Sequence, residues 1–121
     1  MSEERNDMMG RTFLIEPDGL PDLPAMMLVT LGALRDLGGS ANINELDEKI
    51  LELEGVTEAE QAIPMKGDDP RLRANYYLAW ARTFLRRGGA IENSARGIWN
   101  LTSQGSTIEN NREQARNANN L

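Results

Sequence analysis

The stretch from Asn75 to Gly105, NYYLAWARTFLRRGGAIENSARGIWNLTSQG, holds the strongest folding signals in this 121-residue chain. Apolar residues recur at helical spacing in its first part, which predicts a helix over residues 71–87. Two adjacent glycines end this helix. Two short β-prone segments follow, at 90–93 and 98–102, and the turn between them carries Arg96. The stretch therefore predicts a helix followed by a β-hairpin.

Two more helices are expected before this stretch. Asp22 is a suitable N-cap for the first, which is expected to run to about Leu37 and to end at a pair of glycines. Asn42 and Glu45 form a capping-box pattern for the second helix, over residues 43–54. The first helix has apolar residues on nearly all sides. We therefore expect it to be central or partly covered by a partner.

These elements define one folded domain. Residues 22–105 are expected to form it. A flexible lead (1–21), with a β-prone piece at 12–15, precedes the domain. A polar tail (106–121), weakly helical or disordered, follows it. Polar residues, prolines and glycine predict a long loop over 56–70. The order helix, helix, long loop, helix, hairpin is that of a winged helix-turn-helix. The predicted fold class is thus mainly α with a small β-hairpin.

The composition argues against several kinds of site. The chain has no cysteine and no histidine. It therefore lacks disulfides, thiolate metal sites and the usual zinc ligands, and we expect no metal and no cofactor. The longest apolar run is too short to span a bilayer, and the acidic N-terminus does not resemble a signal peptide. We expect a cytoplasmic protein without membrane contact.

The sequence also predicts a protein that is not an enzyme. A metal-dependent nuclease needs acidic residues and a lysine to hold magnesium and to activate water. The only such cluster is Asp47-Glu48-Lys49, which lies inside the helix expected at 43–54. There is no phosphate-binding glycine loop, and without histidine there is no Ser/His/Asp set. No catalytic residue is assigned.

Positive charge is concentrated in one segment of an acidic chain. The net charge is −6. Residues 1–65 hold four basic and fourteen acidic side chains, whereas residues 66–96 hold seven basic and three acidic ones. A patch of one sign can orient a protein on a partner of the opposite sign. Together with the expected fold, the patch favours double-stranded DNA as the partner.

Nine residues of the third helix and the hairpin turn have suitable chemistry for this contact. A recognition helix in the major groove needs side chains that pair with phosphates and side chains that read base edges, and a wing tip can reach the backbone or the minor groove. The candidates are Arg71, Arg73, Asn75, Tyr76, Arg82, Thr83, Arg86, Arg87 and Arg96. Arginines that serve only solubility are the alternative explanation.

The aromatic residues of the third helix are expected mostly in the core. Tyr77, Trp80 and Phe84 are assigned to the core rather than to stacking on bases, whereas Tyr76 lies on the polar face of the helical wheel. Tyr76 with Trp80 is the only pair that could contact a methylated base. This idea is disfavoured because Trp80 is expected to close the core.

The motifs of this region resemble the N-terminal domain of Mrr-type restriction proteins. The similar segments are YLAWARTFLRRGG at 77–89, IENS at 91–94, RGIWNLT at 96–102 and the glycine at Gly105. The resemblance covers about residues 20–105. It implies a winged-helix DNA-recognition domain, which in Mrr-type restriction proteins is followed by a separate nuclease domain that cuts DNA carrying methylated bases. The nuclease domain has no counterpart in this sequence.

The resemblance implies a DNA-facing role for the residues within the matching segments, Arg82, Thr83, Arg86, Arg87 and Arg96. The predicted function is a DNA-binding module that binds duplex DNA through helix 71–87 and the wing at Arg96. One alternative is a module for protein contact, with the apolar first helix as the surface of a homodimer. Another is a targeting subunit, whose partner is a separate or fused nuclease.

Overall fold

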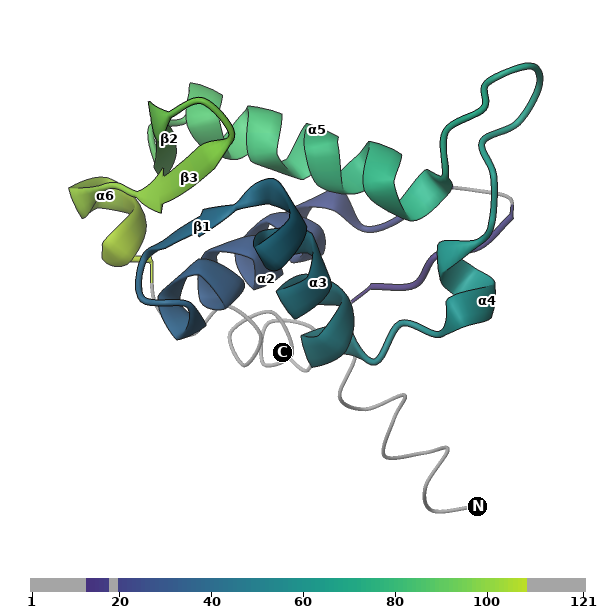
Figure 1. The fold of residues 1–121 in the computed structure, drawn as a ribbon, viewed down its shortest axis with the longest axis horizontal. Helices are drawn as coiled ribbons and strands as arrows, with labels where there is room; N and C mark the ends of the chain where they lie inside the picture. Colours follow the sequence, from purple (N-terminus) through teal and green to yellow (C-terminus); the bar gives the residue numbers. More distant parts are fainter. Residues whose placement is uncertain (1–12, 18–19, 109–121) are drawn as a thin grey trace, which may run out of the picture.

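The computed structural model describes residues 13–17 and 20–108. Its helices and strands are, in order, α2 (Leu23–Asp36), β1 (Ser40–Asn42), α3 (Ile43–Glu54), α4 (Glu58–Gln61), α5 (Arg73–Arg87), β2 (Ile91–Ala95), β3 (Ile98–Leu101) and α6 (Ser103–Ser106). Figure 1 shows the strands gathered at one end of the helical layer and α5 running along one edge. This mainly α architecture with a small sheet confirms the predicted fold class and is compatible with a winged helix.

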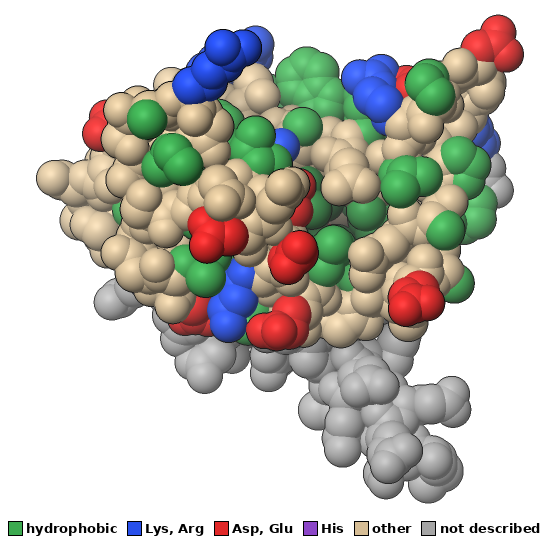
Figure 2. All heavy atoms as spheres, viewed as in Figure 1, with side chains coloured by type: hydrophobic (Ala, Val, Ile, Leu, Met, Phe, Trp, Pro, Cys, Tyr) green, Lys and Arg blue, Asp and Glu red, His purple; other side chains and the backbone are tan. Residues whose placement is uncertain are grey.

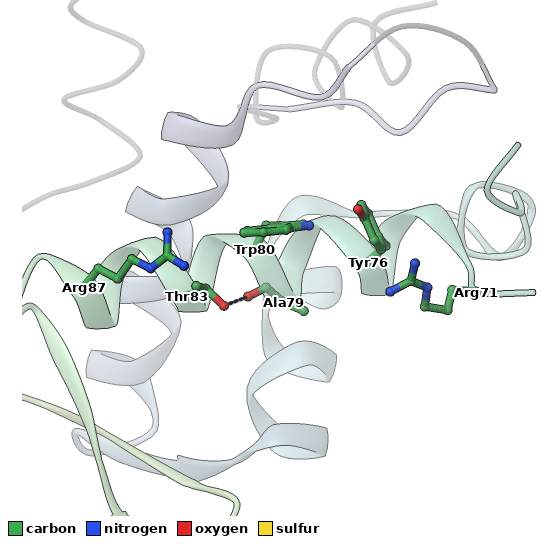
Figure 3. Close-up of a pocket in the computed structure, with 6 residues that line it drawn as sticks. All are labelled: Arg71, Tyr76, Ala79, Trp80, Thr83 and Arg87. Carbon is green, nitrogen blue, oxygen red and sulfur yellow. Dashed lines mark hydrogen bonds between the residues drawn. The ribbon is translucent and has the colours of Figure 1, made fainter. Parts of the chain in front are cut away.

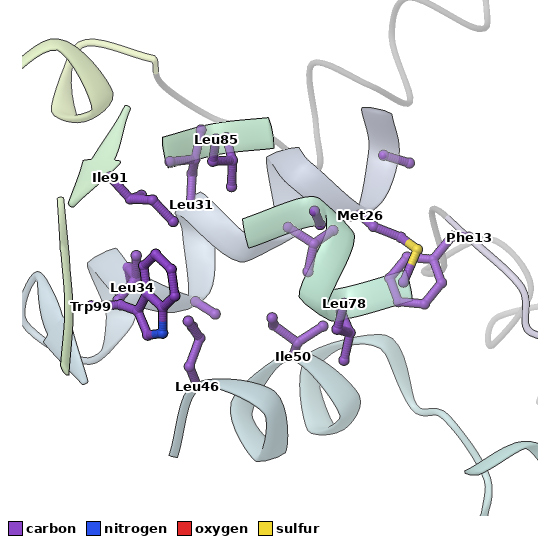
Figure 4. Close-up of a cluster of buried hydrophobic side chains, with 14 of the residues drawn as sticks. Phe13, Met26, Leu31, Leu34, Leu46, Ile50, Leu78, Leu85, Ile91 and Trp99 are labelled. Carbon is purple, nitrogen blue, oxygen red and sulfur yellow. The ribbon is translucent and has the colours of Figure 1, made fainter. Parts of the chain in front are cut away.

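The helix α2 is central, as the sequence predicted. Asp22 caps it, with Oδ1 accepting a hydrogen bond from the Ala25 N–H at 3.1 Å. Met26, Leu31 and Leu34 are buried and form a core with residues of α3, α5 and the sheet (Figure 4). The apolar composition of α2 is therefore accounted for by contacts within the chain. In the described ranges, no helix has the length and apolar character needed to cross a membrane.

The capping box of α3 is confirmed. Asn42 Oδ1 accepts from the Glu45 N–H at 2.8 Å, and Glu45 Oε1 accepts from the Asn42 N–H at 3.0 Å. Gly55 ends the helix with φ at 63°, a left-handed conformation that favours glycine. Leu46 and Ile50 point into the core (Figure 4). Local capping signals in the sequence thus placed this helix correctly.

The segment 56–70 is not the uninterrupted loop that the sequence predicted, because it contains α4. Thr57 Oγ1 accepts from the Glu60 N–H at 3.1 Å and Glu60 Oε1 accepts from the Thr57 N–H at 3.1 Å, a second capping box. A four-residue helix is too short to show apolar periodicity. The Thr-x-x-Glu pattern was the signal available for it.

Part of the N-terminal lead also differs from the prediction. Phe13 and Ile15 are each only 4% exposed and belong to the core, so this piece is not a flexible lead. No strand forms in residues 13–17, and the start of the β-prone piece, Thr12, lies outside the described residues. At the other end, α6 was not expected. The tail from 109 onward lies outside the described residues.

The sheet is antiparallel, with strand order β1-β3-β2. The expected hairpin is present as β2 and β3, although β2 extends to Ala95 and the turn contains only Arg96 and Gly97. The register pairs Glu92 with Asn100 and shifts by a bulge near Asn93. The strand β1 was not predicted, since three residues give too short an alternation. Its pairing with β3 connects the wing to the start of α3.

Candidate nucleic-acid interface

The helix α5 has one side in the core and one side in solvent. Ala74, Leu78, Ala81 and Leu85 are buried. They pack toward α2, the helix with which α5 makes its most extensive contact. The opposite side faces outward along the edge of the molecule (Figure 1). This outward side, together with the wing, is the candidate interface.

Arg82 does not lie on the outward side, contrary to the helical-wheel prediction. It is only 8% exposed, and its Nη1 donates a hydrogen bond to Asp47 Oδ1 at 2.6 Å. Its guanidinium also lies 5.9 Å from the ring centroid of Trp99. The wheel considered α5 alone and could not include a carboxylate on α3. The side chain of Arg82 is therefore engaged inside the fold, where it joins α5 to α3.

Asp47 is the partner that makes this arrangement possible. Burial raises the pKa of its carboxyl, while the charge and hydrogen bond of Arg82 and a hydrogen bond from Asn75 act to lower it. Asn75 is a candidate base reader that is exposed overall, yet its side chain is partly used in this contact. Asp47 thus serves as a structural ion-pair partner within α3.

Arg71 and Arg73, at the start of α5, differ in exposure. Arg73 is buried and its guanidinium lies 5.5 Å from the Tyr77 ring. Arg71 is exposed and lies 4.4 Å over the Tyr76 ring. It donates hydrogen bonds from Nε to Asp69 Oδ1 at 2.8 Å and from Nη2 to Oδ2 at 2.5 Å. These bonds lower the pKa of Asp69 to about 2, so the carboxylate offsets the charge of Arg71 at neutral pH.

Three exposed arginines lie at the other end of α5 and at the wing tip. Arg86 donates a hydrogen bond to the amide oxygen of Asn93 on β2 at 3.3 Å, which links the helix to the wing. Arg87 lies 5.8 Å from the Phe84 ring, and Arg96 occupies the exposed hairpin turn. Among the described residues, none of these three arginines forms an ion pair. They supply uncompensated positive charge.

Two aromatic residues of α5 are on the surface rather than in the core. Trp80 and Phe84 are each 37% exposed, which corrects their predicted assignment. Tyr77 and Tyr76 are half-buried. The helix α5 carries two apolar stripes, one of alanine and leucine and one of aromatic residues, and hydrophobicity alone does not tell which stripe faces the core. In the structure the smaller alanine and leucine side chains fit against α2. The aromatic stripe remains outside, with Trp80 stacked on Phe84 at 5.6 Å between ring centroids.

A hollow of about 280 Å³ lies on this outward side (Figure 3). Its lining residues are Arg71, Tyr76, Ala79, Trp80, Thr83 and Arg87. Tyr76 and Trp80 stand along one side with their ring centroids 6.4 Å apart, and the arginines lie at opposite ends. The Thr83 hydroxyl donates to the Ala79 carbonyl at 3.0 Å, so its oxygen is left as an acceptor. The hollow combines flat aromatic surface with positive charge.

Charge is segregated over the surface as well as along the sequence. In Figure 2, most of the lysine and arginine side chains in view lie along the edge where Figure 1 places α5 and the wing. Most acidic side chains in view lie on the lower half, over α3 and α4. The charge on this edge therefore suits a polyanion.

Residues 24–111 match the family model described as the Mrr N-terminal domain. The chain belongs to this family. The match covers most of the chain, confirms the resemblance seen in the sequence and associates the protein with Mrr-type restriction systems. Comparison with curated proteins and with solved structures found no match.

In this Mrr N-terminal domain, the recognised motifs contain both core and surface positions. Leu78, Leu85 and Trp99 are buried, and Gly105 is packed against Ala90 with no room for a side chain. Much of the motif therefore specifies the fold. Arg86, Arg87 and Arg96 belong to the surface part that could meet a ligand.

Some residues that shape the interface were not identified from the sequence. Asp69 reduces the charge available at Arg71, and Phe84 supports Trp80 by stacking. The Asp69-x-Arg71 spacing was a local signal, whereas the exposure of Phe84 depends on how α5 is turned against α2. In the described part of the chain, no group of three or more acidic side chains is placed to hold a metal ion.

Proposed function

We propose that this Mrr N-terminal domain is a DNA-binding module that docks α5 and the wing onto duplex DNA. The observation that carries the proposal is the set of uncompensated arginines, Arg86, Arg87 and Arg96, on one edge of an otherwise acidic molecule. Arginines in this arrangement suit phosphate contacts on either side of a groove. The hydrogen bond from Arg86 to Asn93 keeps the helix end and the wing together.

In this proposal the nine candidates divide into three groups. Arg86, Arg87 and Arg96 contact phosphates, and Tyr76, Thr83 and Asn75 face the bases. Arg71 adds a phosphate contact when Asp69 releases it. Arg82 and Arg73 are buried and make no direct contact with DNA in this proposal; Arg82 acts indirectly, because its bond to Asp47 sets the position of α5.

We further propose that the module directs a nuclease to its DNA. The basis is membership of the Mrr N-terminal domain family, whose name refers to one end of a larger restriction protein. The nuclease would be supplied by the same polypeptide or by a separate chain. Binding, rather than catalysis, is the role assigned to the residues described here.

The test is fluorescence anisotropy of a labelled duplex at several salt concentrations. We expect salt-sensitive binding by the wild type. In the Arg86→Ala/Arg96→Ala variant, the negative slope of log affinity against log salt should become shallower by about two units. Lys49→Ala removes one positive charge from α3 and is compared with each single variant, Arg86→Ala and Arg96→Ala. A methylated duplex in the same assay tests whether methylated bases are preferred.

Two results would count against this function. No binding at low salt, where the attraction between arginines and phosphates is strongest, would remove DNA as the ligand of this chain. A loss in Lys49→Ala equal to that in Arg86→Ala or in Arg96→Ala would show that overall charge, and not the α5–wing edge, controls the interaction.

A further inference from the structure

The aromatic stripe of α5 is not explained by packing or by phosphate contacts. Tyr76, Trp80 and Phe84 lie four residues apart along one side of the helix, with adjacent ring centroids 6.4 Å and 5.6 Å apart. Trp80 and Phe84 are each 37% exposed. Contiguous exposed apolar surface, unlike single exposed side chains, is a mark of interaction sites. The stripe therefore indicates a contact that residues 13–17 and 20–108 do not make among themselves.

The hollow is formed on only one side of Trp80. Phe84 stacks on Trp80 with an interplanar angle of 29° but is not among the lining residues, whereas Tyr76 is. Ala79 and Thr83 are small side chains in the same lining, and they leave space beside the Trp80 and Tyr76 rings (Figure 3). A flat ring could enter this space and cover aromatic surface without displacing the core.

The charges around the hollow favour a ligand that is flat and anionic. Arg87, which forms no ion pair among the described residues, lies at one end. Arg71 lies at the other end, 4.4 Å over the Tyr76 ring, and is paired with Asp69. The volume of about 280 Å³ is just below the range of roughly 300–1,000 Å³ typical of pockets for drug-sized ligands, so it suits one ring system. A nucleotide offers both parts, a base that stacks and a phosphate that pairs with arginine.

We propose that the hollow between Tyr76 and Trp80 binds one unstacked nucleobase of the DNA on which α5 docks. The base stacks against the aromatic rings, a neighbouring phosphate meets Arg87, and the Thr83 oxygen accepts a hydrogen bond from the base. A second phosphate meets Arg71 once Asp69 releases it. This inference rests on the proposed function and specifies its substrate, which is DNA with an unpaired or easily unpaired base. Such a base is the least costly to extrude from a duplex.

A protein partner fits these features less well. A stable protein interface involves about 20–30 residues on each side, whereas the hollow is lined by six. The structure therefore favours a nucleotide in the hollow, and self-association becomes an outcome that the experiment must separate.

The experiment uses three labelled DNAs, a fully paired duplex, the same duplex with one bulged base, and the single strand. We expect the bulged duplex to bind roughly 10-fold more tightly than the paired duplex, on the scale of one base stacked on aromatic side chains. The chain has two tryptophans, and Trp99 is buried. Stacking on Trp80 is therefore expected to quench the intrinsic fluorescence when the bulged duplex or the single strand binds.

Trp80→Leu is the informative variant, because it should remove both the preference for the bulge and the quenching while leaving affinity for the paired duplex. Ile43→Ala is the matched control, since Ile43 is 38% exposed and lies on α3. Circular dichroism confirms that both variants are folded.

Arginine-dependent binding with equal affinity for paired and bulged DNA would overturn this inference and leave the proposed function standing. Absence of binding to all three DNAs would overturn both. If Trp80→Leu instead changed the molecular mass in sedimentation equilibrium without affecting the bulge preference, the stripe would be a protein contact and the inference would be wrong.

Discussion

At the residue scale, the pair formed by Arg82 and Asp47 decides how α5 is held. Both side chains are almost fully buried, and the bond between Nη1 and Oδ1 is 2.6 Å long. A charge without its partner is costly in such a site, because burial removes its hydration and nothing replaces it. The pair therefore stabilises the orientation that turns Arg86 and Trp80 outward.

We predict that Arg82→Ala lowers the free energy of unfolding at pH 7 by about 3–5 kcal/mol, the range for breaking a buried ion pair. Without Arg82, burial acts on Asp47 with less opposition, so the pKa of its carboxyl in the folded state rises further. A carboxyl whose folded pKa is raised favours folding when protonated. The loss should therefore be largest near neutral pH and should shrink as the pH falls through that pKa.

Urea unfolding at pH 7 and at pH 4.5 measures this effect. The control is the double variant Asp47→Leu/Arg82→Met, which removes both charges and should recover most of the stability. A loss below about 1 kcal/mol in Arg82→Ala, or an equal loss at both pH values, would contradict the structural role assigned to this pair.

This pair also marks the limit of sequence analysis at the residue scale. Asp47 and Arg82 are separated by 35 positions in the chain. From the sequence, Asp47 was considered only as part of the acidic and lysine cluster Asp47-Glu48-Lys49, and Arg82 only as a candidate for DNA contact. Only the packing of α3 beside α5 brings them together. The exposure of Trp80 has the same origin, since it depends on which stripe of α5 faces α2.

At the scale of elements, the long helices were predictable because their signals are local. Asp22 and Asn42 act as caps as expected, and the glycine pair after α5 ends that helix. The short elements β1, α4 and α6 were missed, because three or four residues carry no usable periodicity. The strand β1 depends on its pairing with β3, and α6 depends on a tertiary contact as well. For α4 the local Thr57-x-x-Glu60 pattern was the available signal.

The position of α6 depends on one close backbone approach at Gly105. A Cβ at this position would overlap the Ala90 carbonyl group, which precedes β2. The Gly105 N–H donates to Thr102 Oγ1 at 3.0 Å, and the same hydroxyl donates to the Gly89 carbonyl at 2.6 Å. The glycine thus allows α6 to cover the end of the sheet.

We predict that Gly105→Ala lowers the free energy of unfolding by about 1–3 kcal/mol, the usual cost of forcing extra atoms into a packed site. Gly88→Ala is the matched control, because a Cβ there would meet only ordinary contacts at 3.5 Å and beyond. Thermal and urea unfolding compare the two. Equal stability of both variants would show that α6 can move away from Ala90 without loss.

At the scale of the whole molecule, a net charge of −6 coexists with a positive edge. Long-range repulsion from the acidic side opposes approach to DNA in the wrong orientation, while the edge attracts phosphates. The sequence predicted this asymmetry from the charge count. It could not predict which arginines are free, because Arg82 and Arg71 are both paired with carboxylates in the fold.

The number of free arginines sets the expected salt dependence. Arg86, Arg87 and Arg96 give about three phosphate contacts, so log affinity should fall against log salt with a slope near −3. Asp69→Asn should release Arg71, raise the affinity and steepen the slope by about one unit. Because the pKa of Asp69 is about 2, its carboxylate is ionised and paired throughout an assay near neutral pH.

The control is Glu48→Gln, which changes the net charge by the same amount but lies on α3, on the exposed surface of that helix. If Arg71 is held back by Asp69, the salt slope changes in Asp69→Asn and stays near its original value in Glu48→Gln. Identical changes in the two variants would mean that binding responds to net charge alone. The bidentate contact between Arg71 and Asp69 would then stabilise the loop without affecting DNA binding. The DNA would contact only the C-terminal end of α5 and the wing.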